Sequence, residues 1–318
     1  MTQPPLIALD WARSTAQAVI AARFGEVANL TLLNPDATDQ RNHVFRADLA
    51  QAGHVIVKIG DPDRIALAAA RLAEVYPNMR EGRFRVPQVL LHDAGKGALV
   101  MEDARGQSAE RLFLSGPAGL GRTLASAGAW IARFHKPNAH MRAFNPDPHL
   151  NWLQKQRAAH LDGTRLIPDF AAFDRTLADL TKSAEATRGQ PVLRTVTHRD
   201  FHLRNLLIRN LGRVYGIDFE NAKRDEALRD LLFFLADAAK ISATMPTADH
   251  LRAWATALRA SYNRPLGAGS SQRIFQTAFA LSGWASLGGG HAAPGPNRAR
   301  ALAVMQLIAA TDDLFADP

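Results

Sequence analysis

Three oxygen-bearing side chains lie close together in the sequence and suggest one kind of chemistry. Asp200 lies in a polar segment, Asn205 follows it, and Asp218 comes directly after the apolar run 214–217. Carboxylate and amide oxygens suit Mg²⁺, a hard cation that proteins usually bind through one or two carboxylates while water and phosphate complete its shell. These residue types therefore predict a magnesium site for phosphate chemistry.

Short apolar runs must position these side chains. Residues 192–196, 206–208 and 214–217 have the length and composition of strands, and Asn210-Leu211-Gly212 has the chemistry of a turn. We therefore expect the two aspartates to lie at strand ends, with the asparagine between them in the sequence.

The same stretch matches a family pattern. Its segments 198–200 (His-Arg-Asp) and 217–220 (Ile-Asp-Phe-Glu), with Asn205 between them, resemble the catalytic loop and the metal-binding segment of the kinase-like phosphotransferases. The resemblance is greatest to the aminoglycoside phosphotransferase and choline kinase branch. It implies that Asp200 receives the proton of a substrate hydroxyl, and that Asn205 and Asp218 hold Mg²⁺ against the phosphates of ATP.

Other interpretations of this stretch stay open at this point. In the plainest one, Asp200 is a turn residue, Asn205 begins a strand and Asp218 caps a helix. In another, His198, Asp200 and His202 alternate along an extended segment and ligate zinc or iron, although no other His or Cys cluster completes such a site. We expect His198 to support the loop instead of reacting.

A lysine in the N-terminal part extends the pattern. Val55, Val57 and Ile59 alternate in the apolar run 55–59, which predicts a strand with Lys58 on the opposite face. A buried ammonium needs a partner, and the resemblance implies that this lysine binds the α- and β-phosphates of ATP. The simpler alternative is a lysine on a solvent-facing sheet surface.

The resemblance also implies a partner for this lysine and an adenine site. The start signal Asp61-Pro62 predicts a helix, and Glu74 on that helix is the candidate partner of the lysine, with Glu81 as the second choice. The hinge whose backbone receives adenine is assigned to Met101, Glu102 and Asp103.

The loop expected to cover the phosphates departs from the family pattern. Residues 34–42 contain no glycine, so the close backbone approach to phosphate that glycine allows is not expected there. Thr38, Gln40 and Arg41 are the candidate side-chain donors instead.

The element pattern predicts an α+β fold, and the resemblance implies that this fold is two-lobed and protein-kinase-like. A five-stranded antiparallel sheet plus one helix form an N-terminal nucleotide-binding lobe (1–104), and a larger, mostly helical lobe (105–318) carries the catalytic and substrate-binding groups. The expected strands cover 30–33, 43–47, 55–59, 86–93 and 97–101. Besides the helix that starts at residue 62, helices are expected over 7–24, 120–134, 148–161, 168–188, 225–241, 246–263, 270–287 and 295–315.

The amino-acid composition limits the classes of partner that the protein is expected to bind. The chain has 318 residues, no cysteine and a net charge of +8, which excludes disulfides and favours anionic partners. The basic residues are scattered and aromatic residues are not interleaved with them, which disfavours nucleic acid. No apolar run approaches the roughly 20 residues that span a bilayer, and no signal core is visible. We therefore expect a soluble, cytoplasmic protein without a membrane span.

Together with these features, the resemblance implies an enzyme that moves the γ-phosphoryl group of ATP to a hydroxyl of a small molecule, such as an amino sugar, a sugar or an amino alcohol. His202 and Glu220 are candidate contacts for this acceptor. The lack of a dense acidic cluster disfavours a polycationic aminoglycoside, and the sequence indicates no oligomeric state.

Two alternatives remain. The glycine-free loop suits a non-catalytic nucleotide-binding protein. A protein kinase shares the His-Arg-Asp segment, although Glu220 stands in place of the expected glycine and no Ala-Pro-Glu segment follows.

Overall fold

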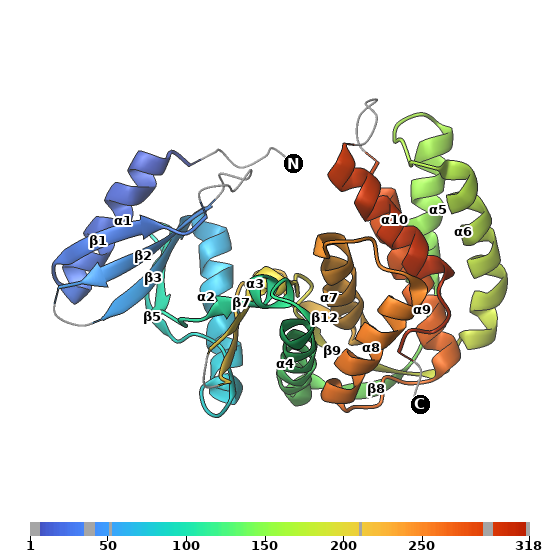
Figure 1. Cartoon of the computed structure of the whole chain (residues 1–318). Coiled ribbons are helices and arrows are strands. Elements are labelled where there is room, and N and C mark those ends of the chain that lie inside the picture. The colour runs from blue at the N-terminus through green and yellow to red at the C-terminus, as the bar shows by residue number, and fades with distance from the viewer. Residues whose placement is uncertain (1–6, 35–41, 51–52, 210–211, 289–294, 316–318) are drawn as a thin grey trace. The chain divides into compact units, whose positions relative to one another are not determined.

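The computed structural model describes residues 7–34, 42–50, 53–209, 212–288 and 295–315. The chain divides into two compact units: Met1–Gln107 with Leu207–Asn221, and Ser108–Leu206 with Ala222–Pro318. The first unit holds the predicted sheet and the second holds most of the helices (Figure 1). The segment Leu207–Asn221 packs with the N-terminal unit, so Asp218 and Lys58 belong to the same unit.

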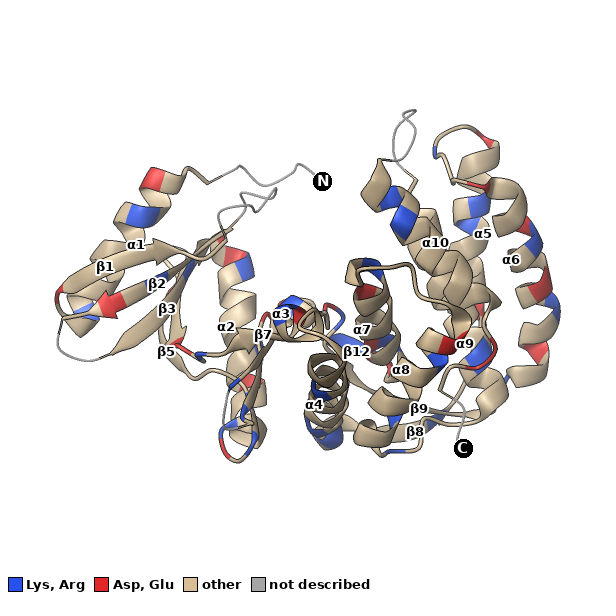
Figure 2. Cartoon of the chain, in the orientation of Figure 1, with Lys and Arg blue, Asp and Glu red and all other residues tan. Residues whose placement is uncertain are grey.

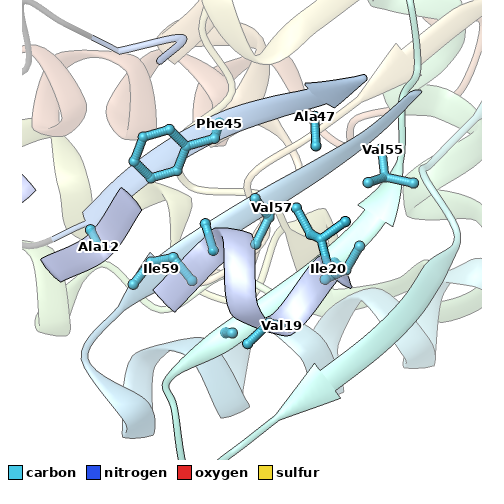
Figure 3. Close-up of a cluster of buried hydrophobic side chains, with 11 residues drawn as sticks. Ala12, Val19, Ile20, Phe45, Ala47, Val55, Val57 and Ile59 are labelled. Atoms are coloured by element: carbon cyan, nitrogen blue, oxygen red, sulfur yellow. The ribbon is translucent and has the colours of Figure 1, made fainter. Parts of the chain in front are cut away.

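The sheet of the first unit has five antiparallel strands in the order β1-β2-β3-β6-β5, as predicted. The strands are β1 (Val27–Leu32), β2 (Asn42–Leu49), β3 (His54–Gly60), β5 (Val89–Asp93) and β6 (Ala98–Glu102). The helix α1 (Leu9–Phe24) ends at Gly25, where the backbone turns to φ 86°. It contributes to one hydrophobic cluster with the sheet (Figure 3), which includes Ala12, Val19, Ile20, Phe45, Val57 and Ile59.

The helix α2 (Pro62–Met79) begins where the sequence predicts. The Asp61 side chain accepts a hydrogen bond from the Arg64 amide at 3.1 Å, and Pro62 occupies the first turn, where its missing N–H costs nothing. Ile65 of α2 packs in a second cluster with Leu99 of β6. Local capping chemistry and an apolar stripe therefore explain this helix.

Short strands complete the first unit. β11 (Val214–Gly216) pairs in parallel with β4 (Phe84–Arg85), and β10 (Leu206–Ile208) lies beside β11, as the predicted hairpin requires. The first two residues of the predicted turn Asn210-Leu211-Gly212 lie outside the described residues. β7 (Gln107–Ser108) comes at the sequence boundary between the units.

The second unit combines helices with a three-stranded antiparallel sheet, in the order β12-β9-β8. Its strands are β8 (His140–Ala143), β9 (Pro191–Thr197) and β12 (Lys223–Glu226). Its helices are α3 (Ala109–Phe113), α4 (Pro117–His135), α5 (Asp147–Leu161), α6 (Phe170–Ala184), α7 (Leu228–Ile241), α8 (Ala248–Tyr262), α9 (Gly269–Ser286) and α10 (Pro296–Ala310). None of the described helices has the length and apolar composition needed to cross a membrane.

Two predicted helices of this unit differ in extent. The helix expected over 225–241 is α7 and begins at Leu228, because β12 pairs with β9 and takes Asp225 and Glu226 into the sheet. The helix expected over 168–188 is α6 and ends at Ala184, followed by the 3₁₀ turn Glu185–Thr187. The sequence analysis missed β8, whose side chains are all exposed, because it has no alternating apolar pattern.

Two glycines of α4 give a testable contrast. A Cβ added at Gly128 would lie 2.3 Å from the carbonyl oxygen of Leu258 on α8, whereas one added at Gly121 would meet nothing within 4 Å. We expect Gly128→Ala to lower the free energy of unfolding by about 1–3 kcal/mol, because the packed helices must move apart. Gly121→Ala should raise it by roughly 0.5–1 kcal/mol through helix propensity. Urea denaturation of both variants measures this, and equal effects would contradict the close packing.

Candidate active site

The loop after β9 positions the predicted catalytic aspartate within the second unit. Arg199 has φ 63°, a left-handed conformation that is sparsely populated by residues other than glycine. Phe201 is fully buried, with ring centroids 5.5 Å from Trp130 and 5.0 Å from Phe234. On either side of this anchor the side chains of Asp200 and His202 stay partly exposed, at 30% and 26%. The chain therefore fixes Phe201 in the core and leaves its two polar neighbours accessible.

A buried aspartate of α7 holds the backbone of this loop. The carboxylate of Asp230 is fully buried and accepts hydrogen bonds from the backbone N–H groups of His198 (2.7 Å) and Arg199 (2.8 Å). His135 Nε2 lies 2.9 Å from the same carboxylate, and His135 Nδ1 lies 2.9 Å from the Tyr262 hydroxyl. Burial alone would raise the pKa of Asp230, but the hydrogen bond and charge of His135 and the proximity of His198 lower it.

Asp200 and Asn205 come together as the sequence predicts. The Asn205 side-chain amide donates to the Asp200 backbone carbonyl at 2.9 Å and to its carboxylate at 3.2 Å. The Asn205 side-chain oxygen has no hydrogen-bond partner among the described residues, which leaves it available to a ligand. The Leu203 amide donates to Asp237 of α7 at 3.0 Å, which fixes the turn between the two residues.

The structure does not support the alternative of a zinc or iron site in this loop. The His198 ring is fully buried and lies among aromatic rings, 6.0 Å from Phe134 and 5.8 Å from Phe201. His202 instead accepts a hydrogen bond from the Arg204 amide. Among the described residues, no group of three or more His, Cys, Asp or Glu side chains is arranged to hold a metal ion. The burial of His198 therefore fits the supporting role expected from the sequence.

Lys58 meets a carboxylate of the predicted metal-binding segment within the first unit. Lys58 lies on β3 and pairs with Leu99 of β6. Leu99 belongs to the hydrophobic cluster with α2, whereas Val57, the neighbour of Lys58 on β3, belongs to the cluster with α1. The Lys58 ammonium lies 3.1 Å from Asp218 and also forms an ion pair with Glu220. Lys58 is 8% exposed. Burial alone would lower its pKa, but the two carboxylates outweigh burial and raise it.

The predicted partner of Lys58 needs a correction. Glu74 forms an ion pair with Arg71 at 2.9 Å and its side chain is 57% exposed, so it does not reach the lysine. The second choice, Glu81, pairs with Arg80. Glu220 takes this position instead and also lies 3.6 Å from Arg64 at the start of α2. The acidic partner therefore comes from the chain after β11 and not from the helix.

The segment predicted to receive adenine contacts other residues of the first unit through its side chains. Met101 lies on β6 opposite Ile56. Glu102 accepts a hydrogen bond from the Tyr215 hydroxyl at 3.1 Å, and its amide donates to the carbonyl of Gln88 at 2.9 Å. Asp103 pairs with Arg46 at 2.9 Å and accepts from the Arg105 amide. The acidic side chains of this segment therefore support its conformation.

The predicted phosphate-covering loop is described only at its base. Thr38, Gln40 and Arg41 lie outside the described residues. Asn34 closes the loop, because its side chain donates to the carbonyl of Asn42 at 3.2 Å and accepts from the Val44 amide at 2.9 Å.

Sequence reasoning missed other polar residues of the second unit. Asp225 pairs with Arg229 at 2.5 Å, and Glu226 lies 3.9 Å from His149. Burial and the neighbouring Glu226 side chain raise the pKa of Asp225 to about 6, whereas the nearby side chains of His149 and Asp225 outweigh burial and lower the pKa of Glu226. The sequence contains only a weak signal for these residues, because two adjacent acidic residues before an apolar helix, such as Asp225 and Glu226, also fit the start of that helix.

A model of the phosphotransferase enzyme family matches residues 33–266. No curated protein matches the chain significantly. The matched range contains the strand lysine, the loop after β9 and the segment after β11.

Solved structures share the fold at low identity. An amicoumacin kinase in complex with AMP-PNP and Ca²⁺ is 13% identical, with a TM-score of 0.61 over 96% of this chain and 98% of its own. A macrolide 2′-phosphotransferase from Brachybacterium faecium is 15% identical, with a TM-score of 0.58 over 92% and 97%. A choline kinase from Streptococcus pneumoniae is 14% identical, with a TM-score of 0.56 over 93% and 98%. The predicted α+β, kinase-like fold is therefore confirmed.

Proposed function

The chain belongs to the phosphotransferase enzyme family, and we propose that it transfers the γ-phosphoryl group of ATP to a hydroxyl of a small molecule. One observation carries the proposal beyond family membership. The Lys58 ammonium meets the Asp218 carboxylate at 3.1 Å, although the two residues are 160 positions apart in the sequence. A buried cation beside a carboxylate is the arrangement needed to bind nucleotide phosphates together with a metal ion. The N-terminal lobe (1–104) would hold ATP, and the helical lobe (105–318) the base and the acceptor.

Mg²⁺ is the metal that the donor atoms fit. The side-chain oxygen of Asn205, which has no partner in the part of the chain that the structure describes, and the 39% exposed carboxylate of Asp218 are hard oxygen donors. We propose that these two residues hold the ion. When bound, Mg²⁺ neutralises charge on the phosphates as the phosphoryl group is transferred.

Asp200 is the proposed base. Its carboxylate is partly exposed, and the Asn205 amide donates to one of its oxygens at 3.2 Å. This hydrogen bond fixes the side chain, so that the other oxygen can accept the proton of the acceptor hydroxyl. Glu220 supports the position of Lys58 in this proposal, and His202 lies beside the base, with Nε2 3.7 Å from Asp200.

Because the reaction consumes ATP, we place the protein in the cytoplasm.

Removal of the strand lysine should weaken nucleotide binding. In Lys58→Met we expect the KM for ATP to rise about 10- to 100-fold, because a hydrogen bond to a charged group contributes roughly 1.5–3 kcal/mol. Lys96→Met is the matched control, since Lys96 is 49% exposed and pairs only with Asp93 among the described residues. Initial rates at varied ATP measure the effect, and the unfolding temperature of each variant checks the fold. An unchanged KM in folded Lys58→Met would contradict the phosphate-binding role.

The function itself is tested by acceptor screening. ADP release is measured with ATP and Mg²⁺ against sugars, amino sugars, sugar acids and amino alcohols, and ³¹P NMR identifies a phosphate ester in each positive reaction. A new ester supports the proposal. Binding of ATP without phosphorylation of any acceptor would instead indicate a non-catalytic nucleotide-binding protein, and transfer only to protein substrates would indicate a protein kinase.

A further inference from the structure

A large pocket lies within the second unit, next to the loop that carries Asp200. Its volume is about 1010 Å³, at the upper end of the roughly 300–1,000 Å³ usual for small-molecule sites. Arg199, the sequence neighbour of Asp200, lines it, as do residues of α5, β12, α7, α9 and α10. The pocket therefore borders the loop that carries the proposed base, with Arg199 as the residue of that loop that lines it.

The lining of this pocket is strongly basic. Seven of its residues are lysine or arginine and two are acidic, Asp225 and Glu226. The two acids are neutralised within the protein: Asp225 lies 2.5 Å from Arg229 and 4.0 Å from Arg199. Glu226 lies 4.0 Å from Arg194 and 3.9 Å from a histidine. Both acids are also buried, so they offer little free negative charge to a cationic ligand.

Three of the basic residues have no such compensation. Among the described residues, no acidic side chain lies within ion-pair distance of Arg142, Lys223 or Arg224, and all three are exposed. Lys223 and Arg224 are consecutive on β12, which is blue at this point in Figure 2. Uncompensated cations that line one cavity raise its potential and attract anions.

Another part of the lining is apolar. Phe233 of α7, Phe279 of α9 and Met305 of α10 line the pocket, and Trp152 of α5 is 38% exposed there. Aromatic and apolar side chains bury the body of a ligand, while a few charged groups fix its orientation. A ligand that combines an anionic group with a ring or carbon skeleton suits both parts.

We propose that this pocket is the acceptor site and that it takes an anionic hydroxyl compound, one that carries a carboxylate or phosphate group on a sugar or carbon skeleton. This inference rests on the proposed phosphotransferase function. The acceptor hydroxyl oxygen bonds to the γ-phosphorus, the bond from that phosphorus to the β–γ bridging oxygen breaks, and the hydroxyl proton passes to Asp200. ATP and the acceptor thus give ADP, a phosphate ester and one proton.

Matched ligands that differ in charge test the inference without turnover. Glucuronate, glucose 6-phosphate, glucose and glucosamine share a pyranose ring but are anionic, anionic, neutral and cationic. A second series of glycerate, glycerol 3-phosphate, glycerol and serinol tests a shorter skeleton. We expect at least one anion of either series to raise the unfolding temperature and to bind at least about tenfold more tightly than its neutral and cationic counterparts. The carboxylate and phosphate arms show which anionic group is preferred.

Charge-reversed variants locate the binding. In the double variant Lys223→Glu/Arg224→Glu we expect the preference for the anion to be lost. The control Lys182→Glu/Arg252→Glu has the same net charge, and its two sites are exposed, pair with Asp179 and Asp249, and do not line the pocket. It should keep the preference. Isothermal titration at two salt concentrations measures this, because screening should weaken an electrostatic preference.

The outcomes separate this inference from the function on which it rests. If glucosamine or serinol binds best, if no anion binds, or if both double variants respond alike, the anionic pocket is wrong. ADP release from ATP in water alone reports on the phosphoryl-transfer centre independently. An anion preference that disappears only in Lys223→Glu/Arg224→Glu supports the proposed anion-binding pocket, even if no member of the panel is phosphorylated. In that case only the proposed phosphotransferase function is contradicted.

Discussion

Asp200→Asn should reduce kcat by about 10²–10⁴-fold, the range that a general base contributes, while ATP and acceptor still bind. The substitution keeps the shape of the side chain and removes its ability to take a proton. Because Asn205 donates to the Asp200 backbone carbonyl as well as to the carboxylate, the loop keeps one of the two hydrogen bonds. We therefore expect an unfolding temperature close to that of the wild type.

A matched control makes this result specific. Asp249→Asn changes the same group on α8, where the side chain is 91% exposed and pairs only with Arg252 among the described residues. It should leave kcat and KM unchanged. Steady-state rates with the best acceptor from the screen separate kcat from KM. A variant with normal kcat and raised KM would show that Asp200 positions the acceptor, and a variant with both constants unchanged would remove it from the reaction.

Local signals in the sequence predicted much of the fold. The N-cap Asp61 with Pro62 starts α2, and the alternation of Val55, Val57 and Ile59 sets the faces of β3. Each of these features depends on residues within a few positions of one another, so local chemistry decides them. The contact of Asp200 with Asn205 is predictable for the same reason.

Contacts between distant segments escaped prediction. Lys58 pairs with Glu220, 162 positions away, and not with Glu74, which lies much closer in the sequence. No local pattern indicates which of several acids meets a buried ammonium, because that depends on how the segment after β11 packs against β3. The helical spacing that pointed Glu74 toward the sheet was also compatible with the exposed position that it has.

The basic pocket was not predicted from the sequence for a related reason. Arg142, Arg194 and Lys223 lie on β8, β9 and β12, which are far apart in sequence but neighbours in one sheet. In the sequence these residues look like scattered surface charges. Only the pairing of the strands gathers them, and only their ion pairs show which cations remain uncompensated.

Asp230→Ala should destabilise the protein more than any other single substitution considered. We expect the free energy of unfolding to fall by about 3–5 kcal/mol, the range for breaking a buried ion pair by removing one partner. The change leaves His135 and the amides of His198 and Arg199 without their acceptor. Because those amides belong to the loop before Asp200, kcat should fall together with stability. Urea denaturation and steady-state rates measure the two effects.

The same residue makes stability depend on pH. The pKa of Asp230 is lower in the folded protein than its ordinary value of 3.8, so its ionised form stabilises the fold. This contribution is fully present above pH 3.8 and is lost as the pH falls from there through the lowered pKa. Asp230→Asn should therefore lose less stability than the wild type in this acidic window. Asp249→Asn, which is exposed, should follow the wild-type curve.

A double-mutant cycle tests whether the buried chain of hydrogen bonds acts as a unit. Tyr262→Phe removes only the hydroxyl that lies 2.9 Å from His135 and should cost roughly 0.5–1.5 kcal/mol. Since Tyr262 and Asp230 contact the same imidazole, their effects should be non-additive by about 0.5–3 kcal/mol, whereas Tyr262→Phe and Asp249→Asn should be additive. If the effects of Tyr262→Phe and Asp230→Asn on the free energy of unfolding are additive, His135 does not couple the two residues. Asp230 would then stabilise the loop that carries Asp200 independently of Tyr262 on α8.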